Sequence, residues 1–243
     1  MSTKLIGWLL LLVLLGGCAT ASISDSGYDA RHGGRSNPLY AGELNELDVL
    51  GIDPTKAVTE KEIAESFATA KRVSTKKGSS IMLIQSGAQF PDDAMMQEMN
   101  KYFSVTSFSG LPLDKDKSKT TADPSNFSRV LRLAAARGGH EVIVCYWGVL
   151  ETAVREHGSK AISWIPIIGG SITDESQQMR IRLKVAVVDV KSGSWSVYSP
   201  EPAENLESSA ERNREQSDQQ QVAALKEKAY KSAVSDFLKM YTN

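Results

Sequence analysis

Cysteine and histidine are the side chains here with the widest chemical range, and both are scarce. The chain holds 2 Cys and 3 His. Cys145 lies in the apolar run 142–147, where a cysteine is expected to be a small buried hydrophobe rather than a nucleophile. His140-Glu141 begins like a zinc-peptidase motif, but Val144 stands where the second metal ligand would be. The sequence therefore predicts no metal site, no cofactor and no enzymatic activity.

The first residues show the pattern of an export signal. Lys4 precedes an apolar run over residues 5–15, which is shorter than the roughly 18 apolar residues that span a bilayer. The run ends in Leu15-Gly16-Gly17-Cys18, which resembles the lipobox of bacterial lipoproteins. The resemblance implies cleavage after residue 17 and lipid, including palmitate, on Cys18. Ala19, rather than Asp, resembles the residue that follows the cysteine in lipoproteins sent to the outer membrane.

The residues after Cys18 have the composition of a linker. Residues 19–37 are rich in Ser, Gly, Asp and Arg and almost free of large apolar side chains. We therefore expect a signal peptide over 1–17, a flexible lipidated tether over 18–38 and one periplasmic domain over 39–243. With 28 basic and 29 acidic side chains the chain has no strong field for a nucleic acid, so no nucleic-acid partner is expected.

Helical and strand patterns alternate from residue 59 onward. Thr59 and Glu62 have capping-box spacing and predict a helix over 60–73. Arg180, Arg182 and Lys184 alternate with apolar residues, which predicts a strand with one face exposed to solvent. The remaining patterns predict strands over 81–84, 102–108, 141–147 and 195–198, and helices that begin near 91, near 124 and before 222. This order favours a single α/β domain, or an α+β one, with a mixed sheet, helices packed on it and a long C-terminal helix.

Three parts of this pattern carry a family resemblance: a helix that ends in two glycines and enters a strand (123–147), the hairpin 187–193, and the closing helix. Together they resemble the α/β domain shared by the amino-terminal part of TolB, the curli-secretion lipoprotein and the lipoprotein activators of penicillin-binding proteins. The resemblance covers roughly residues 81–241. It implies a domain that binds envelope partners and catalyses nothing.

An apolar insertion interrupts the expected sheet. Residues 149–178 are expected to form a loop, and its centre is Trp164-Ile165-Pro166-Ile167-Ile168, followed by two glycines. Pro166 disfavours a central strand. Such a segment either folds back on the core or presents an apolar patch to a partner or a lipid surface. Trp164, Ile165, Pro166, Ile167 and Ile168 are therefore the candidate partner-binding residues, with both outcomes open.

These observations predict a lipoprotein anchored in the outer membrane through Cys18, facing the periplasm and acting as a non-catalytic partner-binding or envelope-assembly module. The expected partners are the membrane and envelope proteins; the sequence does not specify an oligomeric state. The alternative is a periplasmic hydrolase, peptidase- or esterase-like, in which His140 or His157 pairs with a carboxylate. Neither a G-x-S-x-G elbow nor a phosphate-binding loop occurs, but a triad assembled from distant residues leaves no such motif.

Overall fold

Continuous apolar runs form the strands at the centre of the fold. The computed structural model describes residues 22–25, 37, 39–112, 124–155, 162–166, 178–205 and 214–242. Its helices are α1 (Glu46–Leu50), α2 (Glu60–Thr69), α3 (Asp93–Asn100), α4 (Pro124–Arg137) and α5 (Arg214–Tyr241). Its strands are β1 (Ser80–Gln85), β2 (Ser104–Phe108), β3 (Val142–Arg155), β4 (Ile162–Pro166), β5 (Met179–Asp189), β6 (Trp195–Tyr198) and β7 (Ala203–Asn205).

The strands form one mixed sheet with the order β2-β1-β3-β5-β6. β1 runs parallel to β2 and β3, whereas β5 runs antiparallel to both β3 and β6. The outer halves of the two long strands add short neighbours, since β4 pairs with β3 and β7 pairs with β5. The predicted α/β class with a mixed sheet is confirmed.

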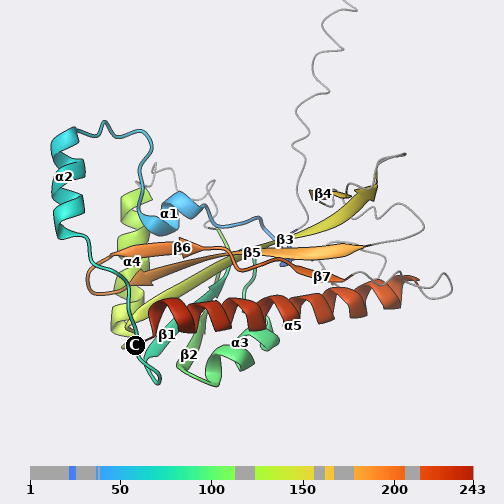
Figure 1. Ribbon diagram of the computed structural model, residues 1–243. Helices are drawn as coiled ribbons and strands as arrows, with labels where there is room; N and C mark the ends of the chain where they lie inside the picture. The colour runs from blue at the N-terminus through green and yellow to red at the C-terminus, as the bar shows by residue number, and fades with distance from the viewer. Residues whose placement is uncertain are drawn as a thin grey trace, which may run out of the picture.

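Helices cover both faces of the sheet (Figure 1). α3 and α5 pack on one face, where Tyr230 meets Tyr146 and Phe237 meets Phe103 in edge-to-face contacts with ring centroids 5.7 and 5.3 Å apart. The apolar stripe expected on the long C-terminal helix is buried there, as predicted; its members are Val222, Leu225, Ala229, Ala233 and Phe237. None of the helices within the described residues combines the length and apolar character needed to cross a membrane.

α1 and α4 pack on the opposite face of the sheet. Their core includes Leu131 and Ala135 of α4 and Val49 and Leu50 of α1. Cys145 lies in the same cluster and is fully buried, which agrees with its interpretation as a small hydrophobe. Burial raises the pKa of its thiol well above the usual value, and the nearby Glu43 carboxylate adds to this effect. The thiol therefore remains protonated and unreactive.

β3 is much longer than the sequence pattern indicates. It continues through Arg155. Its ladder with β5 extends from Val142 opposite Asp189 to Thr152 opposite Met179, and its last residues pair with β4. β4 then turns back along it with Ala153 opposite Trp164. The expectation of a loop throughout residues 149–178 is therefore wrong for 149–155 and 162–166, and residues 156–161 and 167–177 lie outside the described residues.

Residues 22–25, which we call the N-terminal clamp, lie against the edge of β3. Ser22 forms an antiparallel bridge with Val149, and the Ile23 amide donates to the Gly148 carbonyl at 3.0 Å. Ile23 is 1% exposed and belongs to the core under α5. The expectation of a flexible tether over 18–38 is therefore wrong for the clamp, because this segment satisfies backbone groups of β3 that neither β1 nor β4 reaches.

Gly148 makes room for the clamp. A Cβ added at Gly148 would lie 2.5 Å from Cδ1 of Ile23, which is closer than two carbon atoms can approach without displacement. A glycine is therefore needed at this position for its small size, since its side-chain direction is the one that Ile23 occupies.

We expect Gly148→Ala to lower the free energy of unfolding by about 1–3 kcal/mol, because the added methyl overpacks the site of Ile23. Ile23→Ala should cost about 2–5 kcal/mol through lost burial. The double variant should cost less than the sum of the two, since the shortened side chain at position 23 leaves space for the new methyl. Urea denaturation of the three variants measures this coupling, and strictly additive effects would contradict the proposed contact.

Candidate functional site

α2 is built by local sequence signals alone. The Glu62 amide donates to Thr59 Oγ1 at 3.3 Å, and the Thr59 amide donates to Glu62 Oε2 at 2.9 Å. This reciprocal pair is the predicted capping box, and it satisfies backbone donors at the first turn. The helix ends at Thr69, four residues before the expected end at 73.

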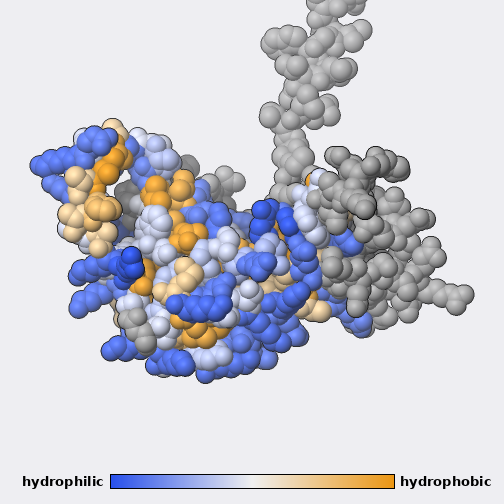
Figure 2. Space-filling model, viewed as in Figure 1, coloured by the Kyte–Doolittle hydropathy of each residue, from blue (hydrophilic) through white to orange (hydrophobic). Residues whose placement is uncertain are grey.

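The apolar face of α2 packs on no core formed by the described residues. Phe67 is 85% exposed and Ile63 is 52% exposed, and Val58, just before the helix, is 63% exposed. Every residue over 54–72 is exposed except Glu62. Figure 1 shows α2 standing apart from both helical layers, and Figure 2 shows hydrophobic surface on it at the upper left. The expectation that the helices pack on the sheet is therefore wrong for α2.

The predicted partner-binding residues begin on β4. Trp164 lies over Arg180, with the guanidinium carbon 4.4 Å from the ring centroid, and it is partly buried. Ile165 on the opposite face of the strand is 47% exposed. Pro166 ends the strand, which is paired within the described residues only with β3, so the proline removes no ladder hydrogen bond of a central strand. Ile167 and Ile168 lie outside the described residues.

A buried ion cluster supports Trp164. The carboxylate of Glu151 is 1% exposed; it accepts from Arg180 Nε at 2.5 Å and is also paired with Arg182. Arg180 reaches Glu204 of β7 at 3.6 Å as well. A buried carboxylate needs such compensation, since an unpaired charge would cost several kcal/mol. The three cations predicted on the solvent-exposed face of β5 therefore differ in exposure. Arg180 is largely buried, while Arg182 and Lys184 remain about half exposed.

The N-terminal clamp is also held by side chains at the carboxyl end of β1. Ser24 Oγ donates to the Ser86 carbonyl at 2.5 Å and accepts from Gln85 Nε2 at 3.0 Å. Gln85 Oε1 in turn accepts from the hydroxyl of Tyr146 at 2.5 Å and from the amide of Asp92 at 2.7 Å. Open α/β sheets usually bind small ligands at the carboxyl ends of their parallel strands. In this protein the clamp occupies that position.

The same network continues to α5. The hydroxyl of Tyr230 donates to Asp92 Oδ2 at 2.5 Å, and the ammonium of Lys226 lies 3.0 Å from the same oxygen. Burial raises the pKa of the phenol groups of Tyr146 and Tyr230 well above the usual value. Both groups therefore remain neutral hydrogen-bond donors, which is what the network requires of them.

The hydrolase alternative can be compared with the observed position of His140. Its Nδ1 lies 2.8 Å from the hydroxyl oxygen of Ser80, so a serine–histidine pair is present. The pair lies where β1 begins and before β3, at the amino ends of these parallel strands. Over the described ranges, no cluster of three His, Cys, Asp or Glu side chains could hold a metal ion. His32 and His157 lie outside the described residues.

Two findings come from comparison with known proteins. The family model described as YafT bacterial lipoprotein matches residues 45–240, which is most of the chain. No curated protein matches the sequence, so the resemblance to the TolB and curli-secretion domains stays a prediction.

Glu43 provides a pH-dependent contribution to stability beside the clamp. Burial raises the pKa of its carboxyl above the usual 4.5, although hydrogen bonds from Ser22 and Ser86 act against this. A raised pKa in the folded state means that the contribution is present below the unfolded value and is lost as the pH rises through the folded one. Glu43→Gln should therefore gain stability relative to the wild type as the pH rises from below 4.5 to neutrality.

Thermal unfolding of both proteins across this pH range measures the difference. Glu62→Gln is the matched control, since hydrogen bonds from Thr59 hold the pKa of that carboxyl below the usual value and give the opposite trend. A Glu43→Gln difference that does not change with pH would show that the carboxyl titrates normally.

Proposed function

We propose, since the chain belongs to the YafT family of bacterial lipoproteins, that it is held in the outer membrane by lipid on Cys18 and faces the periplasm as a non-catalytic partner-binding or envelope-assembly module. The anchor rests on the sequence Leu15-Gly16-Gly17-Cys18 behind a short apolar run. Several acyl chains on one residue anchor a protein stably, because each buried methylene contributes about 0.8 kcal/mol. Ala19 supports the outer membrane as the destination.

The exposed apolar face of α2 is the observation that carries the partner-binding role. A capped helix with Phe67 85% exposed keeps its shape at the cost of exposing apolar surface to water. Amphipathic helices of this kind bind by laying their apolar positions into a groove of another protein. The positions of Ile63 and Phe67, one turn apart, have the spacing of such anchors.

The charges of α2 favour a protein partner over a lipid surface. The helix carries Glu60, Glu62 and Glu65 against the single cation Lys61. Helices that lie in membrane interfaces are rich in Lys and Arg on their polar face, because phospholipid headgroups are partly anionic. An acidic helix with two large apolar side chains therefore fits a groove in an envelope protein better.

We further propose that β4 supplies a second contact. Ile165 is 47% exposed near the end of the strand, and Trp164, Pro166, Ile167 and Ile168 complete the apolar segment. The contact of Trp164 with Arg180 fixes the strand that presents Ile165. A preordered surface loses less entropy on binding than a flexible one.

The hydrolase alternative has one specific observation in its favour, the contact between Ser80 and His140. A nucleophile and base at hydrogen-bond distance are the first requirement of acyl transfer. Ser80→Ala and His140→Ala are its test: an esterase or peptidase activity of the purified protein that both substitutions abolish would establish it and overturn the non-catalytic role.

The anchor predicts that Cys18→Ser removes both palmitate labelling and membrane association. Cells grown with labelled palmitate should incorporate label into the wild-type protein, and the outer-membrane fraction should contain it. The substituted protein should lose the label and most of its membrane-bound fraction. An unlabelled wild-type protein, or one recovered from the cytosol, would contradict the anchor.

Partner binding predicts that Phe67→Ser lowers the yield of cross-links made from α2. A photo-reactive residue at Ala64 should give discrete adducts in intact cells, and Phe67→Ser should lower their yield at least about fivefold. Because the side chain is exposed, the free energy of unfolding should change by less than about 0.5 kcal/mol. Phe90→Ser, at another residue that is 69% exposed, is the matched control and should leave the adducts unchanged.

If the adducts from Ala64 persist in the Phe67→Ser protein, the apolar face of α2 is not the binding surface.

A photo-reactive residue at Ile165 tests the second contact, that of β4, in the same cells.

A further inference from the structure

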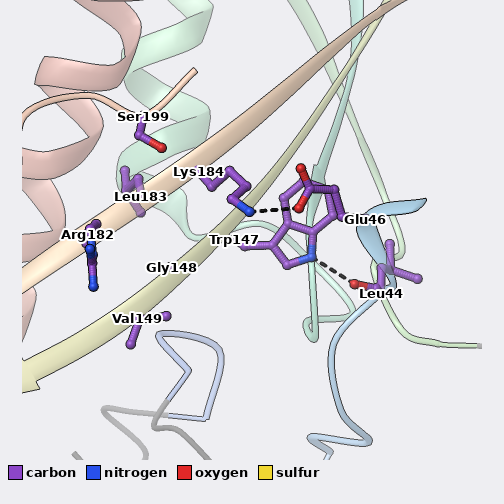
Figure 3. Close-up of a pocket in the computed structure, with 9 residues that line it drawn as sticks. All are labelled: Leu44, Glu46, Trp147, Gly148, Val149, Arg182, Leu183, Lys184 and Ser199. Carbon is purple, nitrogen blue, oxygen red and sulfur yellow. Dashed lines mark hydrogen bonds and ion pairs between the residues drawn. The ribbon is translucent and has the colours of Figure 1, made fainter. Parts of the chain in front are cut away.

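A groove of about 450 Å³ lies directly beside the N-terminal clamp. Among its lining residues are Trp147, Gly148 and Val149 of β3 and Arg182 and Lys184 of β5 (Figure 3). Gly148 and Val149 are the residues with which Ile23 and Ser22 form their backbone contacts. The groove and the clamp are therefore adjacent along β3.

Trp147 and Val149 give the groove an apolar wall with cations beside it. Trp147 lies opposite Lys184 in the ladder and Val149 lies opposite Arg182, so the four side chains project on the same face. The indole Nε1 donates to the Leu44 carbonyl at 2.9 Å, which fixes the ring. The side chains of Arg182 and Lys184 remain 53% and 48% exposed.

Acidic partners orient these cations without enclosing them. Lys184 Nζ is 2.7 Å from Glu46, and Arg182 contacts Glu151 through one terminal nitrogen. Since both groups carry several N–H donors and stay half exposed, each can also donate to a phosphate oxygen. Tryptophan, lysine and arginine are the side chains that proteins place at the headgroup level of membranes.

The number of residues between Cys18 and the clamp limits how far the groove can lie from the membrane surface. Ala19, Thr20 and Ala21 are the residues between Cys18 and Ser22. Four steps of an extended chain span at most about 14 Å. Ser22 is bridged to Val149, so a lipid on Cys18 holds the adjacent edge of the sheet within about that distance of the membrane surface.

We propose that the groove beside the clamp is a membrane-contact site, in which Arg182 and Lys184 bind phospholipid phosphate and Trp147 lies at the headgroup level. This inference rests on the proposed lipid at Cys18. The clamp then acts as an orienting device, because it joins the anchor to the folded domain through three residues and not through a long tether. The occupant of the groove is the headgroup layer of the bilayer that holds the anchor.

Tryptophan quenching by brominated phospholipids tests this orientation. The full lipidated protein is placed in vesicles of phosphatidylethanolamine and phosphatidylglycerol as two variants, W164F/W195F, which retains Trp147, and W147F/W164F, which retains Trp195. Trp195 is 45% exposed and pairs opposite Val188, about 20 Å along β5 from Arg182. Brominated lipid should quench Trp147 at least about twofold more than Trp195.

Two further changes separate the short anchor from the phosphate contacts. A twelve-residue Gly/Ser insertion between Ala21 and Ser22 should lower the quenching of Trp147 to the level of Trp195, because the domain is then released from the surface. R182Q/K184Q in the Trp147 variant should lower it as well, and added salt should reproduce part of this loss. Lys191→Gln, an exposed lysine in the turn after β5, is the matched control and should have no effect.

Flotation of the vesicles keeps the two proposals distinguishable. Protein that floats with the vesicles but shows equal quenching of Trp147 and Trp195 would overturn the membrane-contact site and leave the anchor intact. Quenching of Trp147 that survives R182Q/K184Q unchanged would overturn the phosphate contacts. Protein that fails to float and carries no palmitate would overturn the anchor, and the orientation with it.

Discussion

The edge of β3 that faces away from β5 must be hydrogen-bonded along a length that no single neighbour covers, and the rest of the structure depends on how this is achieved. Its ladder with β1 ends at Tyr146, and its ladder with β4 starts at Glu151. Ser22 and Ile23 bond to the residues between, and Gly148 admits the Ile23 side chain. Since unsatisfied buried backbone groups are costly, the clamp is part of the sheet and not an appendage.

The clamp also occupies the place where α/β sheets usually bind small ligands. Ser24, Gln85 and Tyr146 fill the carboxyl end of β1 with a hydrogen-bonded network that reaches α5 through Asp92. These side chains are therefore bonded to one another at this end of the sheet. The surfaces that remain available are on the outside of the fold: the unpacked face of α2, the exposed side of β4 and the groove along the outer half of β3 and β5.

The proposed anchor would fix the positions of the proposed binding surfaces relative to the membrane. A lipid on Cys18 joined to Ser22 through three residues allows little independent rotation of the domain. The groove at Trp147 would then be held at the bilayer, and α2 would keep a defined position from which to meet envelope proteins. Preordering both contacts lowers the entropy lost when a partner binds.

Local patterns in the sequence determined most of the elements, whereas the tertiary structure alone decided the outer half of β3, its pairing with β4 and which surfaces the elements leave open. The capping box at Thr59, the alternation over 179–184 and the apolar stripe from Val222 are set by neighbouring residues, so periodicity predicts them. The burial of Ile23 depends on Gly148, more than a hundred residues away, and the exposure of Phe67 depends on the absence of a packed neighbour among the described residues. Both are long-range packing outcomes, which no short window of sequence contains.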